Sequence, residues 1–273
     1  MIVADRFVKP LFVVGDSHCI ATNGLLLKDE ASGVPFAVGE SIFIPKIRAD
    51  EVMADEVIHT GLIWALSGCC VLSHWPPPTS PERGLPHHGL LLAAHPWATS
   101  RDILILIGSI DARDVIRSVP IDAEIEMPFP VDLSALPHDG IDRVVSAAQV
   151  SELVMNHFRP LFRALVKLRS LGLVRLHLGA LPPPTVDDQL FLDKHEIASR
   201  ALVRYQVHLT INHTMRAFCA QSGIPFVDPW MDVTERNVVR DGWLPDGVHL
   251  GPAGAVATLM RFLESTMKVV VPS

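Results

Sequence analysis

PLFVVGDS, residues 10–17, begins with a short apolar run between a proline and a glycine, a pattern typical of a buried strand. Gly15, Asp16 and Ser17 then end the strand in a polar turn. These residue types dominate turns, so the tripeptide taken alone fits a simple turn as well as a functional site. Because open α/β sheets bind their ligands at the carboxyl ends of strands, Ser17 lies where a functional side chain is expected.

A second polar motif, DGVHL at residues 246–250, lies near the other end of the chain. Asp246 and His249 are three residues apart, so a turn places them on one side. An imidazole backed by a carboxylate is held in one tautomer, and its second nitrogen can accept a proton from a serine. Serine is a weak nucleophile that needs such a base, so Ser17, His249 and Asp246 form a candidate catalytic triad. The simpler alternative is that Asp246 caps the next helix and His249 is solvated.

Strands and helices are expected to alternate along the chain. Besides residues 10–14, strands are expected at residues 33–48, 69–73, 103–107, 173–178 and 224–227. Helices are expected at residues 50–66, 147–171, 194–222 and 255–269, and Pro160 is expected to kink or divide the second of these. The alternation predicts an α/β fold of three layers, α/β/α, around a doubly wound and mostly parallel sheet.

A chain of 273 residues suits one α/β domain, and its 49% hydrophobic content and mean hydropathy of +0.31 are enough for a large core. Two proline-rich insertions are expected in this domain, near residues 74–100 and 120–142. The first is long for a connection in a compact domain, which is typical of a lid or binding loop. The alternative is a rigid surface excursion.

Composition excludes several classes of function. The net charge of −7 argues against a nucleic-acid partner, since phosphate binding needs basic patches. The apolar runs are shorter than the ~20 residues of a membrane span, and no secretory signal pattern precedes the first strand. The four cysteines show no disulfide framework, which favours a cytoplasmic location, and we expect Cys19 to be a small packed residue. The 13 histidines lack metal-ligand spacing, so we expect no metal and no cofactor.

Four short motifs in order resemble those of the SGNH/GDSL hydrolase family. Gly15-Asp16-Ser17 matches the first block of that family, and residues 246–249 match its last block. Gly108-Ser109-Ile110-Asp111 follows the strand at residues 103–107 and occupies the place of the family's Gly-x-Asn-Asp block. Residues 224–228 resemble the last strand of the family, so the resemblance extends from about residue 11 to about residue 263.

One departure from the family concerns the oxyanion. The family's third block supplies an asparagine that helps bind the oxyanion, and Ile110 stands there without a donor. In hydrolases, the loss of one such donor reduces the stabilisation of the transition state by roughly 3–4 kcal/mol. Arg113 is the nearest replacement, and a bacterial subset with Gly-Glu-Ile-Asp-Cys-Arg in this place is similar. Its guanidinium suits an oxyanion or an anionic substrate group. The alternative is a structural clamp in which Arg113 pairs with Asp111, Asp114 or another carboxylate.

Two further residues take roles from the resemblance. The family's second block supplies a glycine whose N–H joins that of Ser17 in binding the oxyanion. Gly61 is assigned this place, with Gly39 and Gly68 as alternatives. Asp111 is expected to brace the active-site loops.

The resemblance implies a serine hydrolase that cleaves a carboxylic ester, an O-acetyl or short-acyl ester of a small molecule or carbohydrate, through an acyl-enzyme on Ser17. One alternative is an acyltransferase that uses the same triad, which a lid at residues 74–100 would favour. Another is a non-catalytic binding protein on a hydrolase scaffold, which the loss of a donor at Ile110 would favour. The oligomeric state is left open.

Overall fold

The structure is a computed structural model that describes residues 8–43, 102–170 and 175–268. Four expectations from the sequence therefore lie outside the described residues: the helix at residues 50–66, the strand at residues 69–73, the insertion at residues 74–100 and the position of Gly61.

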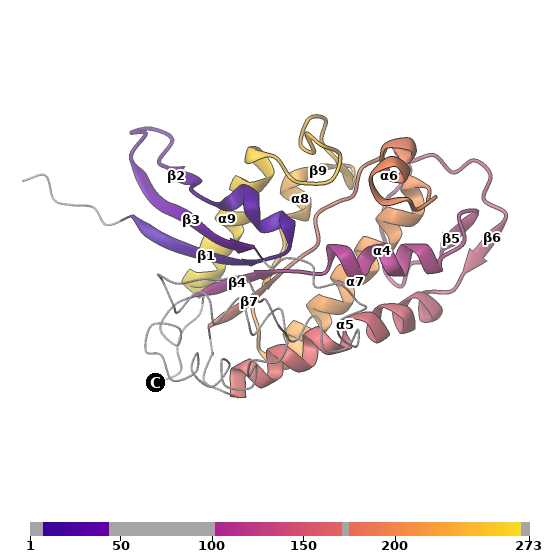
Figure 1. Cartoon of the computed structure of the whole chain (residues 1–273), viewed down its shortest axis with the longest axis horizontal. Coiled ribbons are helices and arrows are strands. Elements are labelled where there is room, and N and C mark those ends of the chain that lie inside the picture. The colour runs from indigo at the N-terminus through magenta and orange to yellow at the C-terminus, as the bar shows by residue number, and fades with distance from the viewer. Residues whose placement is uncertain (1–7, 44–101, 171–174, 269–273) are drawn as a thin grey trace, which may run out of the picture.

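The described residues form a six-stranded sheet in the order β2-β3-β1-β4-β7-β8 (Figure 1). Its strands, in chain order, are β1 (Lys9–Gly15), β2 (Leu26–Lys28), β3 (Pro35–Phe43), β4 (Ile103–Leu106), β7 (Leu176–Gly179) and β8 (Phe226–Val227). All neighbours run parallel except β2, which is antiparallel to β3 at the edge. The predicted fold class, an α/β fold with a mostly parallel sheet, is confirmed.

The position of β1 in the sheet determines where a site can form. β1 pairs with β3 on one side and with β4 on the other, so the direction of winding reverses beside it. Gly15 at the end of β1 is in register with Leu106 at the end of β4. A crevice at such a reversal, outside the carboxyl ends of the strands, is where doubly wound sheets bind their ligands.

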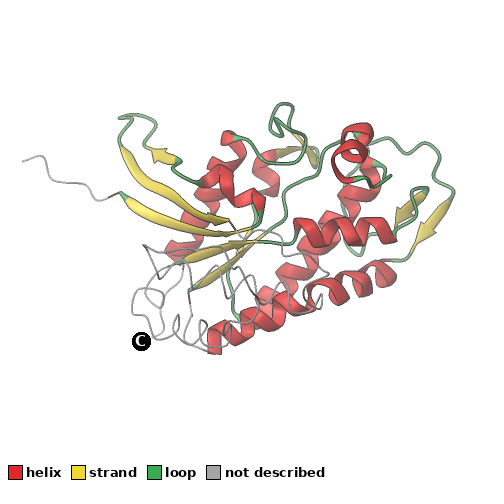
Figure 2. Ribbon diagram, viewed as in Figure 1, coloured by secondary structure: helices red, strands yellow, loops and turns green. Residues whose placement is uncertain are grey.

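Helices cover both faces of this sheet (Figures 1 and 2). The helices, in chain order, are η1 (Ser17–Thr22, a 3-10 helix), α4 (Ser109–Ser118), α5 (Ala147–Ser170), α6 (Asp188–His195), α7 (Ala201–Ser222), α8 (Trp230–Val233) and α9 (Pro252–Lys268). Two small two-stranded sheets complete the fold, β5 (Ala123–Ile125) with β6 (Arg143–Val145), and β9 (Thr234–Glu235) with β10 (Val238–Val239).

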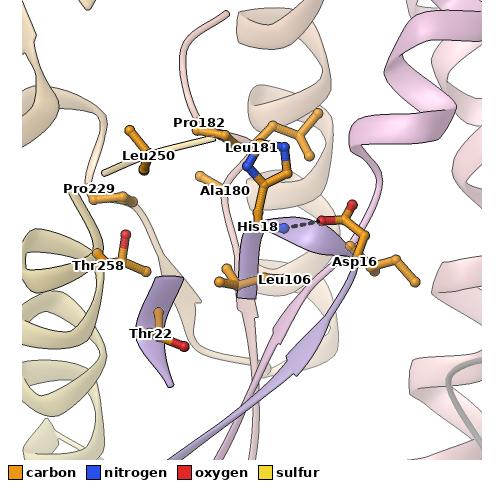
Figure 3. A pocket seen from close by; sticks show the side chains of 12 residues that line it. Asp16, His18, Thr22, Leu106, Ala180, Leu181, Pro182, Pro229, Leu250 and Thr258 are labelled. Atoms are coloured by element: carbon orange, nitrogen blue, oxygen red, sulfur yellow. Dashed lines mark hydrogen bonds between the residues drawn. The ribbon is translucent and has the colours of Figure 1, made fainter. Parts of the chain in front are cut away.

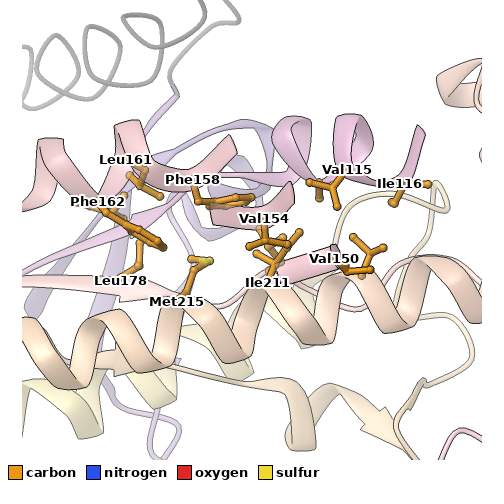
Figure 4. Packing of buried hydrophobic residues seen from close by; sticks show 14 of the residues in the cluster. Val115, Ile116, Val150, Val154, Phe158, Leu161, Phe162, Leu178, Ile211 and Met215 are labelled. Carbon is orange, nitrogen blue, oxygen red and sulfur yellow. The ribbon is translucent and has the colours of Figure 1, made fainter. Parts of the chain in front are cut away.

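Side chains of each central strand alternate between two separate cores, as the twofold repeat of a strand requires. Ile103 and Ile105 of β4 pack into the larger core, which α4, α5 and α7 cover with residues such as Phe158 (Figure 4). Leu104 and Leu106 face the opposite way, toward the smaller core that α9 covers. Both faces of the sheet are therefore buried, which gives the three predicted layers.

Gly15 allows β1 and β4 to approach closely at their carboxyl ends. A Cβ atom at this position would lie 1.8 Å from the carbonyl oxygen of Leu106. The next residue, Asp16, donates its backbone N–H to the same oxygen at 2.9 Å. Glycine is therefore needed where the chain leaves the sheet toward Ser17.

Three details differ from or refine the sequence expectations. α5 runs without interruption through Pro160, so the expected division of this helix is wrong. The turns on either side of the proline are held by the buried side chains of Phe158, Leu161 and Phe162. The expected helix at residues 194–222 is two helices, α6 and α7. Residues 120–142 are largely irregular as predicted, with one short strand, β5.

Within the described part of the chain, no helix has both the length and the apolar character needed to cross a membrane.

The smaller core makes a direct prediction about stability. Leu259 of α9 is completely buried there beside Phe262, so Leu259→Ala should lower the free energy of unfolding by about 2–5 kcal/mol. The neighbouring Met260 is 37% exposed, and Met260→Ala should cost less than about 0.5 kcal/mol. Urea unfolding of both variants measures the difference, and equal losses would contradict the packing of α9 on the sheet.

Candidate active site

The structure brings Ser17, His249 and Asp246 together from the two ends of the chain. Ser17 begins η1 directly after β1, and the loop that carries Asp246 and His249 leads into α9. The Ser17 Oγ lies 2.7 Å from His249 Nε2, and His249 Nδ1 lies 2.6 Å from Asp246 Oδ2. The three side chains thus form one continuous hydrogen-bonded chain at the carboxyl edge of the sheet.

The backbone of the last loop holds Asp246 in place. Gly247 has a φ of 76°, in the left-handed region that favours glycine, and the loop turns there. After this turn, the N–H groups of Val248 and His249 donate to Asp246 Oδ1 at 3.0 and 2.8 Å. Partial burial would raise the pKa of Asp246, but hydrogen bonds from the side chain and backbone of His249 and from Val248 lower it well below its usual range. The carboxyl group therefore stays ionised.

An ionised Asp246 determines which nitrogen of His249 carries the proton. A carboxylate only accepts hydrogen bonds, so His249 Nδ1 must be the donor in the 2.6 Å contact. In the neutral ring, Nε2 then holds a lone pair and accepts the hydroxyl proton of Ser17. The arrangement can chemically activate a serine hydroxyl for attack on an acyl carbon.

Asp16 connects the loop after β1 to the loop after β4. Its carboxylate is buried and accepts from the Ser109 hydroxyl at 2.6 Å and from the Ser109 backbone N–H at 3.2 Å. Its other oxygen accepts from the His18 backbone N–H at 3.1 Å and caps η1. Asp16 thus fixes the turn that presents Ser17. The sequence places Asp16 in a polar turn and in the first block of the family resemblance, and nothing in it indicates that Ser109 is its partner.

Cys19 is the other nucleophilic side chain close to Ser17. It is completely buried in the smaller core, and burial raises the pKa of its thiol to about 12. Thiolate is the reactive form of cysteine, so this side chain is inert at neutral pH. Cys19 is a packed residue, as the sequence predicts.

Two cavities flank His18, whose ring lies 5.0 Å from that of His249 between centroids. The first is mainly apolar, and Figure 3 shows the His18 ring next to Leu181 and Pro182 at its upper edge. The second is lined by Arg113, His195, His208, Gly247, Val248 and neighbouring residues. The loop after β7, residues 180–184, contributes to both cavities.

His18 has a buried nitrogen without a partner. Its Nδ1 makes no hydrogen bond to any described residue. Burial is the main cause that lowers the pKa of His18; the charge of Asp16 opposes it, and the charge of Arg113 adds to it. His18 is therefore a neutral ring between the two cavities, where it can contact a bound molecule.

Arg113 lies on α4 at the wall of the second cavity. Its guanidinium makes no hydrogen bond or ion pair within 4.0 Å with any described residue, and Asp114 pairs with Arg117 instead at 2.6 Å. The structural clamp considered from the sequence is therefore not formed with Asp111 or Asp114. Asp111 lies in the first turn of α4, where its bracing role stays a prediction.

The position of the glycine that is expected to supply the second oxyanion donor is not described. Gly61 and Gly68 lie outside them. Gly39 lies within β3, where its N–H donates to the carbonyl of Leu25 at 2.9 Å, so this alternative is wrong. The N–H of Ser17 itself has no acceptor among the described residues, so it can donate to a bound oxygen.

A second Ser–His–Asp arrangement lies at the opposite, amino end of β4. His177 Nδ1 is 2.6 Å from Ser265 Oγ, and His177 Nε2 is 3.1 Å from Asp102 Oδ1. His177 is completely buried, Asp102 also binds the Arg175 guanidinium through both oxygens, and neither cavity at the other edge reaches them. This trio links β4, β7 and α9. It has the same residue types as Ser17, His249 and Asp246, but it lies away from both cavities.

The described histidines and acids do not gather into a metal site. No group of three or more His, Cys, Asp or Glu side chains within residues 8–43, 102–170 and 175–268 is placed to hold an ion. His208 instead hydrogen bonds through Nδ1 to the carbonyl of Pro182 at 2.8 Å.

Comparisons with known proteins give distant structural likenesses. No protein-family model matches the chain, and no curated protein matches its sequence. A protein named TesA is 15% identical with a TM-score of 0.43, over 96% of this chain and 100% of its own. A GDSL-like lipase from Bacteroides thetaiotaomicron is 10% identical with a TM-score of 0.44, over 96% and 89%.

The native aryl esterase of M. smegmatis is 15% identical with a TM-score of 0.41, over 96% of this chain and 100% of its own. Likenesses at this level carry no functional argument, so the function has to follow from the site itself.

The link between Asp16 and Ser109 makes a testable prediction. Ser109→Ala removes a short hydrogen bond to a buried carboxylate and should lower the free energy of unfolding by about 1.5–3 kcal/mol. Ser118→Ala, at the exposed end of the same helix, should cost less than about 0.5 kcal/mol. Urea unfolding compares the two, and an unchanged stability of Ser109→Ala would show that this link is not formed.

The second trio predicts a pH dependence of stability. Burial would raise the pKa of Asp102, but hydrogen bonds from His177 and Arg175 outweigh it and lower the pKa below the unfolded value of about 3.9. The unfolded chain therefore binds the proton first as pH falls, and stability present at neutral pH is lost in acid. Between about pH 5 and pH 2, the free energy of unfolding should fall less in Asp102→Asn than in the wild type. Urea unfolding at several pH values measures this, and plots of the free energy of unfolding against pH that run parallel for the two proteins would contradict the prediction.

Proposed function

We propose that this protein is a serine hydrolase of the SGNH/GDSL family that cleaves a carboxylic ester through an acyl-enzyme on Ser17. The observation that carries the proposal is the 2.7 Å contact between Ser17 Oγ and His249 Nε2, with Asp246 at 2.6 Å behind the ring. The contact lies at the reversal point of the sheet, where doubly wound folds bind their ligands.

Acylation begins when Ser17 gives its hydroxyl proton to His249 Nε2 as Oγ attacks the ester carbonyl carbon. The imidazolium formed is stabilised by the ionised Asp246, which keeps its own charge. His249 then returns the proton to the alcohol oxygen as the bond between carbon and alcohol breaks. The alcohol leaves, and the acyl group remains bound to Ser17 Oγ.

Deacylation repeats the same proton transfers with water. His249 Nε2 accepts a proton from a water molecule that attacks the acyl carbon, and then gives that proton to Ser17 Oγ as the acid leaves. The oxyanion of each tetrahedral intermediate is assigned to the Ser17 N–H and, as the sequence resemblance implies, to the Gly61 N–H.

The apolar cavity beside His18 favours a short acyl group. Its lining is mostly apolar, including Leu106, Leu181, Pro229 and Leu250. Burial of a few methylene groups there would add about 0.8 kcal/mol of binding for each. An O-acetyl or short-acyl ester of a small molecule or carbohydrate, which the sequence resemblance implies, is the proposed substrate class. The acyltransferase alternative depends on residues 74–100, which lie outside the described residues.

The mechanism predicts which substitutions abolish activity. Ser17→Ala and His249→Ala should each lower kcat for a short-chain para-nitrophenyl ester by a factor of about 10⁴ or more, and Asp246→Asn by about 10⁴ because His249 takes the wrong tautomer. Wild type should be labelled once by a fluorophosphonate, and Ser17→Ala should not be labelled.

Ser265→Ala is the matched control, because it removes the serine of the second Ser–His–Asp trio and leaves the first intact. It should keep both labelling and turnover. Full activity in Ser17→Ala would sink the proposal, and an unlabelled wild type without esterase activity would favour the binding-protein alternative.

A further inference from the structure

The second cavity has a chemistry that differs from the first. Its lining includes Arg113, His18, His195, His208, Gly247 and Val248. The described residues of this lining contribute a guanidinium and three imidazoles and no carboxylate. It adjoins the triad on two sides, through His18 next to Ser17 and through Gly247 and Val248 in the loop of His249.

Arg113 is the charged group of this cavity. Burial is the main cause that lowers the pKa of its guanidinium, and Asp16 is the first of the nearby acids that oppose this effect. Asp16 is already occupied by Ser109 and the His18 N–H, and Asp114 by Arg117. The Arg113 fork is thus partly desolvated without a hydrogen-bonding partner among the described residues.

The three histidines around Arg113 are neutral. Burial, with a contribution from the charge of Arg113, lowers the pKa of His195 and of His208 to about 4. His208 donates from Nδ1 to Pro182, which leaves its Nε2 as an acceptor, whereas the buried Nδ1 of His18 has no partner in the described part of the chain. Among the described residues that line it, the cavity therefore offers one permanent positive charge, with neutral polar groups around it.

The two roles that the sequence suggests for Arg113, binding of the oxyanion and binding of an anionic substrate group, require different positions. An oxyanion donor must lie about 3 Å from the oxygen on the carbon that Ser17 attacks. The Arg113 cavity adjoins the triad through His18, which follows Ser17, and through Gly247 and Val248, which precede His249. This place beside the triad suits a part of the substrate beyond the reacting carbon.

We propose that Arg113 and the cavity around it bind an anionic oxygen group, a carboxylate or phosphate, on the substrate. The inference rests on the proposed ester hydrolysis and names its substrate class: esters that carry a negative charge on the acyl or the alcohol part. The guanidinium fork matches such groups with two parallel hydrogen bonds.

Two pairs of esters test the preference and locate the anion. The acyl pair is para-nitrophenyl hemisuccinate and para-nitrophenyl pentanoate, and the alcohol pair is para-acetoxyphenylacetate and its neutral amide. In one pair the wild type should prefer the anionic ester by about tenfold or more in kcat/KM, the effect of one charged hydrogen bond. The pair that shows it tells which part of the substrate occupies the cavity.

Variants on α4 assign the preference to Arg113. The ratio of kcat/KM between anionic and neutral esters should fall about tenfold or more in Arg113→Gln and less in Arg113→Lys, which keeps the charge without the fork. Arg117→Gln is the matched control, because Arg117 lies one turn further along α4, exposed and paired with Asp114. In Arg117→Gln, the ratio of kcat/KM between anionic and neutral esters should equal that of the wild type. An equal ratio in Arg113→Gln would overturn the proposal.

Succinate binding tests the cavity independently of the ester chemistry. Calorimetry should detect succinate, but not succinamide, on the wild type and on Ser17→Ala, with binding weakened about tenfold or more in Arg113→Gln. Thermal melting checks that the variant is folded. If no ester is cleaved and Ser17 is not labelled, the proposed function fails while succinate binding still decides the cavity. No succinate binding to the wild type, or no preference in either ester pair, would overturn the inference.

Discussion

The buried Asp16 carboxylate is the constraint on which the site depends. It joins the loop after β1 to the first residue of α4 through Ser109, at the place where β1 and β4 lie in register and the sheet reverses its winding. A buried carboxylate needs such partners, since an unpaired one would cost several kcal/mol. The same contact therefore fixes the turn of Ser17 on one side and the helix that carries Arg113 on the other.

The electrostatics of the site follow from a few hydrogen bonds of the last loop. Hydrogen bonds from the His249 ring and from two backbone N–H groups hold Asp246 ionised. Asp246 in turn sets the tautomer of His249, which leaves Nε2 able to accept from Ser17. The second trio, Asp102, His177 and Ser265, shows that a serine, a histidine and an aspartate in hydrogen-bond contact are not by themselves sufficient for a catalytic site. There Arg175 neutralises Asp102, and His177 is completely buried, away from both cavities.

The sequence predicted the strands around Ser17 and the meeting of Ser17 with His249, because apolar runs and short polar motifs mark strand ends directly. It did not predict the break between α6 and α7, since Glu196 ends α6 in a left-handed conformation, φ 56°, where a glycine usually gives the signal. It also did not predict that His195 and His208 lie with Arg113, because three separate helices bring them together and no spacing along the chain encodes that contact.

In the proposed mechanism, Ser17 carries the acyl group during turnover. Acid quenching during steady-state cleavage of a slowly deacylated ester, followed by mass spectrometry, measures this directly. One acyl adduct is expected, localised by fragmentation to Ser17 and absent from Cys19 two residues further on, and Asp246→Asn should accumulate this adduct more slowly. Turnover without any adduct on Ser17, or an adduct on Cys19, would contradict this mechanism.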